Sequence, residues 1–195
     1  MVSRTSLLRG GAIACLAAGA LVLAQGLWIP VKADIAQLLL AQAWTRAIDG
    51  ESAPTPWPWA DTWPVARLSV PQLGEHAIVL AEAGGEALAF GPSLLNASAA
   101  PGENGVSVIA AHRDTHFAFL QHVQAGQTIV VERPDGPPAL YRVTGSEIVE
   151  ADRSGIQVEG GPPRLALVTC WPFGSITPGP LRYVVWAEAV DMNTI

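Results

Sequence analysis

The chain is poor in cysteine, with only Cys15 and Cys170 among its 195 residues. It has no C-x-x-C or H-E-x-x-H motif, so closed zinc-site spacing is missing, and nothing in the spacing favours a site of His112, His116 and Cys170. Cys15 lies inside an apolar N-terminal stretch, which argues against a disulfide and leaves Cys170 as a free thiol. We expect no metal and no cofactor.

Basic residues are also few: 11 Lys and Arg stand against 17 Asp and Glu, for a formal net charge of -6. No stretch concentrates the positive charge, so nucleic acid is not an expected partner. Half of the residues are hydrophobic and 14% are charged, which is typical of a globular or membrane-attached chain and excludes a disordered one. Apart from a membrane segment, the length suits one domain.

The N-terminal stretch predicts a membrane anchor over 1–31. Between Arg9 and Lys32 lie 22 uncharged residues, which as a helix would extend roughly 33 Å, enough to cross a bilayer core. Arg4 and Arg9 precede the span, so we expect a single pass through the cytoplasmic membrane, with the N-terminus inside and the domain facing the periplasm or cell exterior. The alternative is a signal peptide cleaved after Ala24, but the apolar run exceeds the ~7–15 residues of a signal-peptide core.

Residues 32–64 are predicted to connect the anchor to the domain. Residues 34–48 have apolar side chains at helical spacing behind the possible cap Asp34, which predicts an amphipathic helix. Residues 49–64 contain four prolines and three tryptophans. The prolines exclude regular structure, and the tryptophans Trp57, Trp59 and Trp63 indicate that the segment packs onto something.

The remaining residues, 65–195, are predicted to form a mostly β catalytic domain. Short runs rich in Val, Ile and aromatics alternate with Gly, Pro and Asn clusters, and seven or eight strands so spaced favour a closed barrel or a sandwich. The expected strands are 65–70, 76–82, 106–112, 127–133, 139–151, 164–170 and 182–190. A short helix is expected over 114–123, capped by Asp114.

Two residues near the C-terminus can form a thiol-centred site. If 164–170 and 182–188 are neighbouring antiparallel strands, Cys170 faces Arg182, with Cβ atoms ~5 Å apart. A guanidinium can stabilise a thiolate or a developing oxyanion. His112 ends another strand and could donate a proton to a leaving amine. From pattern alone, a surface arginine and a capping histidine remain open alternatives.

The stretches "VIAAHRDTHFAFL" (108–120), "LALVTCWPFG" (165–174) and "LRYVVWAE" (181–188) resemble, in order and spacing, the sortases, a family of membrane-anchored cysteine transpeptidases. The likeness spans residues from about 60 onward and implies a sortase-type barrel. The stretch "WPWADTWPVARLSVP" (57–71) further resembles the class GN sortases of Gram-negative proteobacteria.

The resemblance implies roles for individual residues. Cys170 matches the nucleophile, His112 the acid that protonates the leaving amine, and Arg182 the arginine that steadies the thioester intermediate. Thr169, before the nucleophile, is implied to line the peptide groove, and Ala111 and Val168 are taken as further substrate-binding residues. Ala111 replaces the family's usual glycine.

The resemblance also implies a substrate. A signal of the L-P-x-T-G type would be cleaved between Thr and Gly through a Cys170 thioester and passed to an amine. The class GN likeness suggests one dedicated, membrane-linked substrate protein. The segment 147–163 corresponds to the connection that helps sortases recognise the signal.

Three alternatives remain to be weighed. The L,D-transpeptidases place Arg within two residues of Cys, whereas Arg182 lies 12 positions after Cys170, which decides against them. A noncatalytic, membrane-anchored binding domain would use the barrel only to present its tryptophans. A cysteine peptidase that mainly hydrolyses would share the same site.

Overall fold

The computed structural model describes residues 4–81, 84–85 and 87–190, without the side chains of residues 4–12, 14, 24, 27, 29 and 30. The chain divides into two compact units, Met1–Leu38 and Leu39–Ile195. One helix, α1 (Arg4–Ile48), runs through the first unit and ends in the second. The sequence pattern predicts an anchor and a separate amphipathic helix, and the structure instead has one continuous helix.

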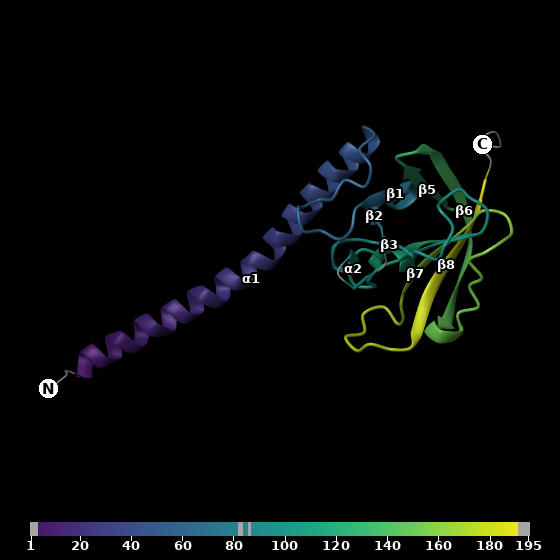
Figure 1. The fold of residues 1–195 in the computed structure, drawn as a ribbon. Coiled ribbons are helices and arrows are strands. Elements are labelled where there is room, and N and C mark those ends of the chain that lie inside the picture. The colour runs from purple at the N-terminus through teal and green to yellow at the C-terminus, as the bar shows by residue number, and fades with distance from the viewer. Residues whose placement is uncertain (1–3, 82–83, 86, 191–195) are drawn as a thin grey trace. The chain divides into compact units, whose positions relative to one another are not determined.

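The second unit is built around a closed β-barrel in which the strands follow the order β1-β2-β3-β4-β7-β8-β6-β5 (Figure 1). β5 pairs with β1 and so closes the ring. The strands are β1 (Pro64–Val70), β2 (Glu75–Leu80), β3 (Ser93–Leu94), β4 (Val106–Ala110), β5 (Thr128–Arg133), β6 (Gly136–Glu150), β7 (Arg164–Cys170) and β8 (Leu181–Ala189).

Helices within the second unit are short. They are η1 (Pro71–Leu73), α2 (Ala87–Phe90), η2 (Ala118–His122) and η3 (Ala151–Arg153). The η elements are 3₁₀ segments of three to five residues at strand connections. Apart from the end of α1, the helices of this unit therefore only link strands of the barrel.

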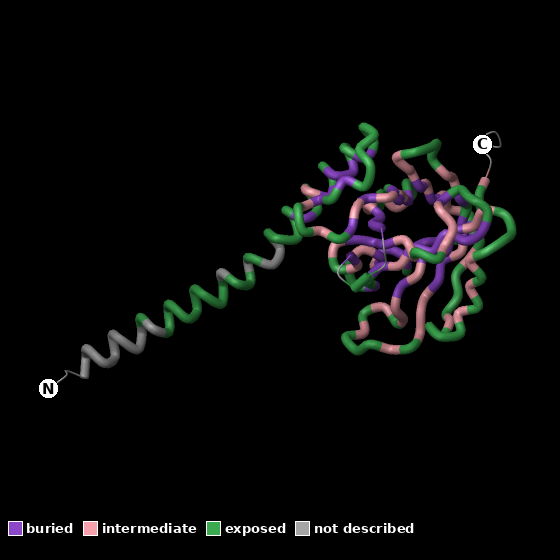
Figure 2. The backbone as a smooth tube through the Cα atoms, viewed as in Figure 1, coloured by how far each residue is buried: buried purple, intermediate pink, exposed green. Residues whose placement is uncertain are grey.

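Side chains alternate along the strands between the barrel interior and its outer surface, as a β-strand requires. The interior is one apolar cluster contributed by nearly every strand, including Leu68, Ile109, Tyr141, Leu165 and Val185. Burial is concentrated on the strands and on the last turns of α1 (Figure 2). This alternation decides which residues at the strand ends can share a site.

The predicted closed barrel is confirmed, and each predicted strand has a counterpart within a few residues. β3 is not among the predicted strands, because two residues show no periodicity. The predicted helix over 114–123 is wrong. Residues 114–117 form turns and only Ala118–His122 is helical, as 3₁₀. Phe117 and Leu120 must both reach the barrel interior directly after β4, which a tight 3₁₀ turn allows.

The end of α1 packs against the barrel unit. Leu40 is fully buried in a small cluster with Leu80 and Ala87. The predicted connecting segment 49–64 partly packs as well: Trp57 lies edge-on to Phe90 at 4.8 Å between ring centroids, while Trp59 is 80% exposed.

In the part of the chain that the structure describes, no helix meets the length and hydropathy needed to cross a membrane. The predicted anchor over 1–31 falls in large part on side chains outside the described residues. The anchor and the predicted boundaries at 31/32 and 64/65 stay predictions.

Candidate active site

The ends of β4 and β7 meet at one edge of the barrel. The two strands are parallel neighbours, with Ala110 paired to Val168, so their carboxyl ends lie side by side. The pairing continues past β4, because the Ala111 N–H donates to the Val168 carbonyl at 3.1 Å. His112 follows directly, and Cys170 is the last residue of β7. The same register brings His112 level with Cys170 on strands about 4.8 Å apart.

Cys170 and Arg182 lie directly opposite each other in the antiparallel pair of β7 and β8, as the sequence predicts. Both side chains are partly buried. Val168 and Val184, each two residues away along its strand, belong to the apolar cluster outside the barrel interior, so the thiol and the guanidinium share that outer face. Three adjacent strand ends thus carry His112, Cys170 and Arg182 in a row.

The guanidinium of Arg182 is held at the start of β8 by the loop that precedes it. Its Nη1 donates to the carbonyl oxygens of Gly179 at 2.8 Å and Leu181 at 2.9 Å. Two hydrogen bonds donated by one nitrogen restrain the group, and no carboxylate of the described residues lies within 4.0 Å of it. A fixed cation opposite a thiol can stabilise an oxyanion formed on its acyl adduct.

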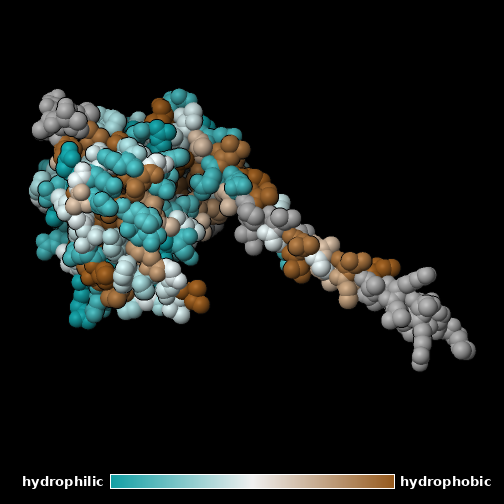
Figure 3. Space-filling view, turned by 180° about the vertical axis from the view of Figure 1, so that it is seen from behind, coloured by the Kyte–Doolittle hydropathy of each residue, from teal (hydrophilic) through white to brown (hydrophobic). Residues whose placement is uncertain are grey.

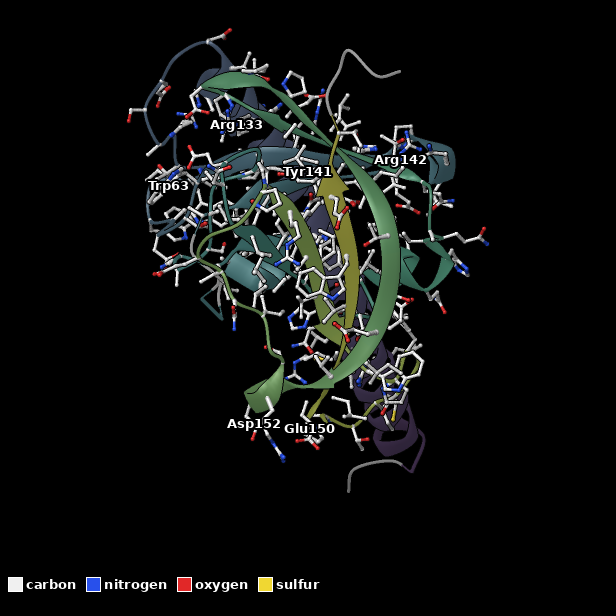
Figure 4. All side chains as sticks on the ribbon, turned by 90° about the vertical axis from the view of Figure 1, so that its right-hand side faces the viewer. Trp63, Arg133, Tyr141, Arg142, Glu150 and Asp152 are labelled. Atoms are coloured by element: carbon white, nitrogen blue, oxygen red, sulfur yellow. The ribbon has the colours of Figure 1, made fainter. Side chains whose placement is uncertain are left out.

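An apolar surface leads up to the thiol on the outer face. Val168 from β7 and Val149 from β6, which pairs with Arg182, are partly exposed beside the site. Ile156 and Val158, from the connection between β6 and β7, pack against the same cluster. Figure 4 shows β6, β8 and β7 side by side, with Glu150 and Asp152 marking the end of the barrel where the site lies. An extended apolar segment can pack there.

His112 and His116 lie near each other, and the other two histidines lie on other elements. His112 is exposed at the site, whereas His76 lies on β2 and His122 at the end of η2. His116 is partly buried, and burial, followed by the nearby His112, lowers the pKa of its imidazole below 6.5. No group of three or more His, Cys, Asp or Glu within the described residues is arranged to hold a metal ion.

The predicted substrate-binding residues do not share one face. Val168 lies on the outer face with Cys170, but Ala111 belongs to the interior cluster. Thr169 is 2% exposed, and its hydroxyl donates to the Ala111 carbonyl at 2.7 Å. Neighbouring residues of a strand point to opposite faces, so Thr169 cannot line the surface on which Cys170 lies. In the structure Thr169 instead joins the ends of β4 and β7.

Sequence reasoning missed Arg113, which follows His112 directly. It is 9% exposed, and its Nη2 donates to the carbonyl oxygens of Ser175 and Thr177. The sequence feature that could have drawn attention to Arg113 is its charge, at a position between the end of a strand and an apolar stretch.

An aromatic cluster behind the thiol was also missed. Trp171 stacks on Tyr183 at 5.7 Å between centroids, and Phe173 meets both rings edge-on. Together with Gln121 these rings line a hollow of about 260 Å³. Tyr183 and Phe173 pack against the interior cluster, so the hollow lies on the face opposite to Cys170.

Fold and site together define a β-barrel protein with a thiol, an imidazole and a guanidinium on adjacent strand ends. The sortase domain family matches residues 68–190, which is more than half of the chain, and the chain belongs to the sortase family.

Among curated proteins, sortase D of Bacillus subtilis (strain 168) is 26% identical over 124 residues, covering 63% of this chain. The chain spans 62% of the length of that relative. Sortase A from Corynebacterium diphtheriae is 21% identical, with a TM-score of 0.62 over 85% of this chain and 87% of that one. The Clostridium perfringens sortase D5 transpeptidase is 20% identical, with a TM-score of 0.59 over 66% of this chain and 80% of that one. At such identities the two structures establish likeness of fold.

Proposed function

We propose that this protein is a cysteine transpeptidase that cleaves a peptide signal in a substrate protein and transfers the acyl fragment to an amine. The observation that carries the proposal is the direct pairing of Cys170 with Arg182 across β7 and β8, level with His112 at the end of β4. Membership of the sortase family supports the same chemistry.

In the proposed reaction the Cys170 thiolate attacks the scissile carbonyl carbon and forms a tetrahedral intermediate. The Arg182 guanidinium stabilises the oxyanion, since its charge does not depend on pH. When the C–N bond breaks, the imidazolium of His112 gives its proton to the leaving amine, and a thioester remains on Cys170. An acceptor amine then attacks the thioester, loses a proton to His112, and releases the thiolate.

For the substrate we propose a signal of the L-P-x-T-G type, cleaved between Thr and Gly. Its apolar first residues suit the surface that Val168 and Val149 form beside the thiol. Ile156 and Val158, from the connection between β6 and β7, would border the same peptide. The sequence likeness of residues 57–71 to class GN sortases supports one dedicated substrate protein.

For localisation we propose that residues 1–31 anchor the protein in the cytoplasmic membrane, with the barrel facing the periplasm or cell exterior. The supporting observations are the uncharged run between Arg9 and Lys32 and the two arginines that precede it. Membrane fractionation, with protease added to intact and to opened cells, tests the proposal. Recovery of the chain in the soluble fraction contradicts the proposal. So does a barrel that the protease cleaves only after the cytoplasmic membrane itself has been opened.

A thiol-reactive probe built on an L-P-x-T peptide tests the chemistry. Cys15 is an exposed second thiol on α1, so all variants carry Cys15→Ala. We expect the parent to be labelled and Cys170→Ala to remain unlabelled. If the parent and Cys170→Ala are labelled equally, or if neither is labelled, the result contradicts the proposed enzymatic function and favours a noncatalytic binding domain.

Mass analysis of the products separates transfer from hydrolysis. The L-P-x-T-G peptide is incubated with the parent and with a glycine-based amine. A joined product supports the transpeptidase. If only the free acid appears over a wide range of amine concentrations, the alternative of a hydrolysing cysteine peptidase is favoured.

A further inference from the structure

Arg113 connects the segment that follows β4 to the loop between β7 and β8. The loop comprises residues 171–180 and joins Cys170 to the strand that carries Arg182 (Figure 1). Arg113 as a whole residue is 9% exposed, and its Nη2 donates to the carbonyl oxygen of Ser175 and, at 2.9 Å, to that of Thr177. Since Arg113 follows His112 directly, one backbone segment holds both the imidazole and the loop.

The loop is held at a second point by the site itself. Arg182 donates from Nη1 to the carbonyl of Gly179 at 2.8 Å. At the point that Arg113 binds, the loop is also internally bonded, with the Thr177 N–H donating to the Ser175 hydroxyl oxygen at 3.3 Å. Ile176 lies between the two carbonyls bound by Arg113 and is 99% exposed. The loop backbone is thus fixed from both sides while an apolar side chain projects into solvent.

The charge of Arg113 is costly for the fold. No carboxylate lies within 4.0 Å of it in the described residues, and its Nη1 is buried without a hydrogen-bond partner. A buried cation with only carbonyl partners loses more hydration free energy than it regains, and apolar replacement of such groups is often neutral or stabilising. Stability alone therefore gives little reason for an arginine here.

We propose that Arg113 is a positioning residue that holds the loop 171–180 so that a peptide can approach Cys170. The proposal rests on the proposed transpeptidase function and extends it to a residue that touches neither substrate nor thiol. Without the guanidinium the loop carbonyls of Ser175 and Thr177 lose their donor, and the loop moves relative to the strand ends that it joins. Peptide binding weakens, while Arg182 keeps its place on β8 opposite Cys170 and its hydrogen bond to the Leu181 carbonyl, so the reactivity of the thiol changes much less.

The test uses Arg113→Met and Arg113→Lys in the full chain carrying Cys15→Ala. We expect Arg113→Met to lower kcat/KM for the L-P-x-T-G peptide by about ten- to a hundredfold, mainly through KM. Its thermal midpoint should stay equal or rise, and its rate of alkylation by iodoacetamide should stay within about twofold of the parent. Arg113→Lys keeps a donor for the loop carbonyls and should recover part of the loss.

Arg133→Met is the matched control. Arg133 has a largely buried side chain, 19% exposed, and lies at the opposite end of the barrel from Glu150 (Figure 4). We expect it to leave kcat/KM within about twofold of the parent. A parent-like KM in Arg113→Met overturns the positioning role. So does a thermal midpoint that falls together with activity in both Arg113 variants, since that outcome assigns a purely structural role.

Failure of the proposed function gives a different result. In that case the parent shows neither Cys170-dependent labelling nor a joined product, and the positioning role falls with it. An active parent with a fully active Arg113→Met overturns the positioning role alone.

Discussion

The hydroxyl of Thr169 donates to the carbonyl oxygen of Ala111 at 2.7 Å, within the barrel interior. Thr169 precedes Cys170, and Ala111 precedes His112. The bond therefore joins the backbones that carry the proposed nucleophile and the proposed acid, from the face opposite to the chemistry. In this structure the side chain of the residue before the thiol bonds the ends of β4 and β7 to each other.

Thr169→Val should weaken both stability and activity. The change keeps the shape of the side chain but leaves the Ala111 carbonyl without its hydroxyl donor, at a cost of about 1–3 kcal/mol in the free energy of unfolding. We also expect kcat/KM to fall by about tenfold or more, because His112 loses its fixed position relative to Cys170. Chemical denaturation and steady-state kinetics measure the two effects.

Thr62, just before β1, is a matched control. It is also 2% exposed, and its hydroxyl donates to the Ala81 carbonyl at the same 2.7 Å, but it bonds the residue that follows β2 and not the strands that carry His112 and Cys170. Thr62→Val should cost similar stability and leave kcat/KM unchanged. Equal kinetic losses in the two variants would show that Thr169 matters only for stability.

Arg182→Ala should lower kcat/KM by about 10²–10³, the range found when one oxyanion-stabilising donor is removed. Arg182→Lys keeps the charge but lacks the planar group that faces Cys170, and should fall in between. Arg164→Ala is the control, because Arg164 lies on the same outer face of β7 and pairs with Glu188. It lies six residues, or roughly 20 Å, from Cys170 along the strand. A similar loss in Arg164→Ala would contradict a specific role for Arg182.

His116 should make the fold sensitive to acid. Burial, and then the neighbouring His112, lowers the pKa of its imidazole below 6.5 in the folded state. The unfolded state therefore binds more protons as the pH falls through 6.5, and the contribution of neutral His116 to stability, complete above that pH, is lost below it. We expect His116→Gln to show a smaller drop in unfolding free energy between about pH 8 and pH 5 than the parent.

His76→Gln controls for loss of an exposed histidine, since His76 is exposed on β2. Equal pH dependence in the parent and His116→Gln would exclude His116 as the source of the acid sensitivity. His116→Gln should also keep transpeptidation near the parent rate, whereas His112→Ala should lose orders of magnitude. The reverse result would move the proposed acid to His116.

The last turns of α1 should contribute to the stability of the barrel unit. Leu40 is fully buried against Leu80 and Ala87, so Leu40→Ala should cost about 2–5 kcal/mol of unfolding free energy. Ile48 is 49% exposed on the same helix, and Ile48→Ala should cost less than about 1 kcal/mol. Equal, small effects would show that the folded domain begins after α1, as the predicted boundary at residue 65 implies.

The strands were predictable because each has several apolar or β-branched residues in a run bounded by turn formers. The facing of Cys170 and Arg182 followed from the length of the loop between their strands. The helix over 114–123 was predicted from a cap and an apolar stripe. The structure has turns and a short 3₁₀ segment there instead, because Phe117 and Leu120 both pack into the interior cluster.

Part of the candidate site could not be predicted from the sequence, for a physical reason. That Ala111 and Thr169 point inward depends on the register between β4 and β7, which are separated by 53 residues of chain. The alternation of neighbouring strand residues could have separated Thr169 from Cys170. The contact of Arg113 with Ser175 and Thr177 joins segments 62 and 64 positions apart, and no local pattern signals it.

On the surface shown in Figure 3, apolar groups are scattered among hydrophilic ones. No large apolar face on this side marks the active site. The candidate site is recognised instead from the residues at the strand ends.

The parallel pairing of β4 with β7 divides the site between two parts of the chain. A cut between Pro134 and Asp135, at the turn from β5 to β6, would leave His112 and Arg113 on one fragment and Cys170 and Arg182 on the other. Neither fragment could then catalyse alone. Regained turnover on mixing would report their association, so the barrel could serve as a split enzyme for detecting contact between two attached proteins.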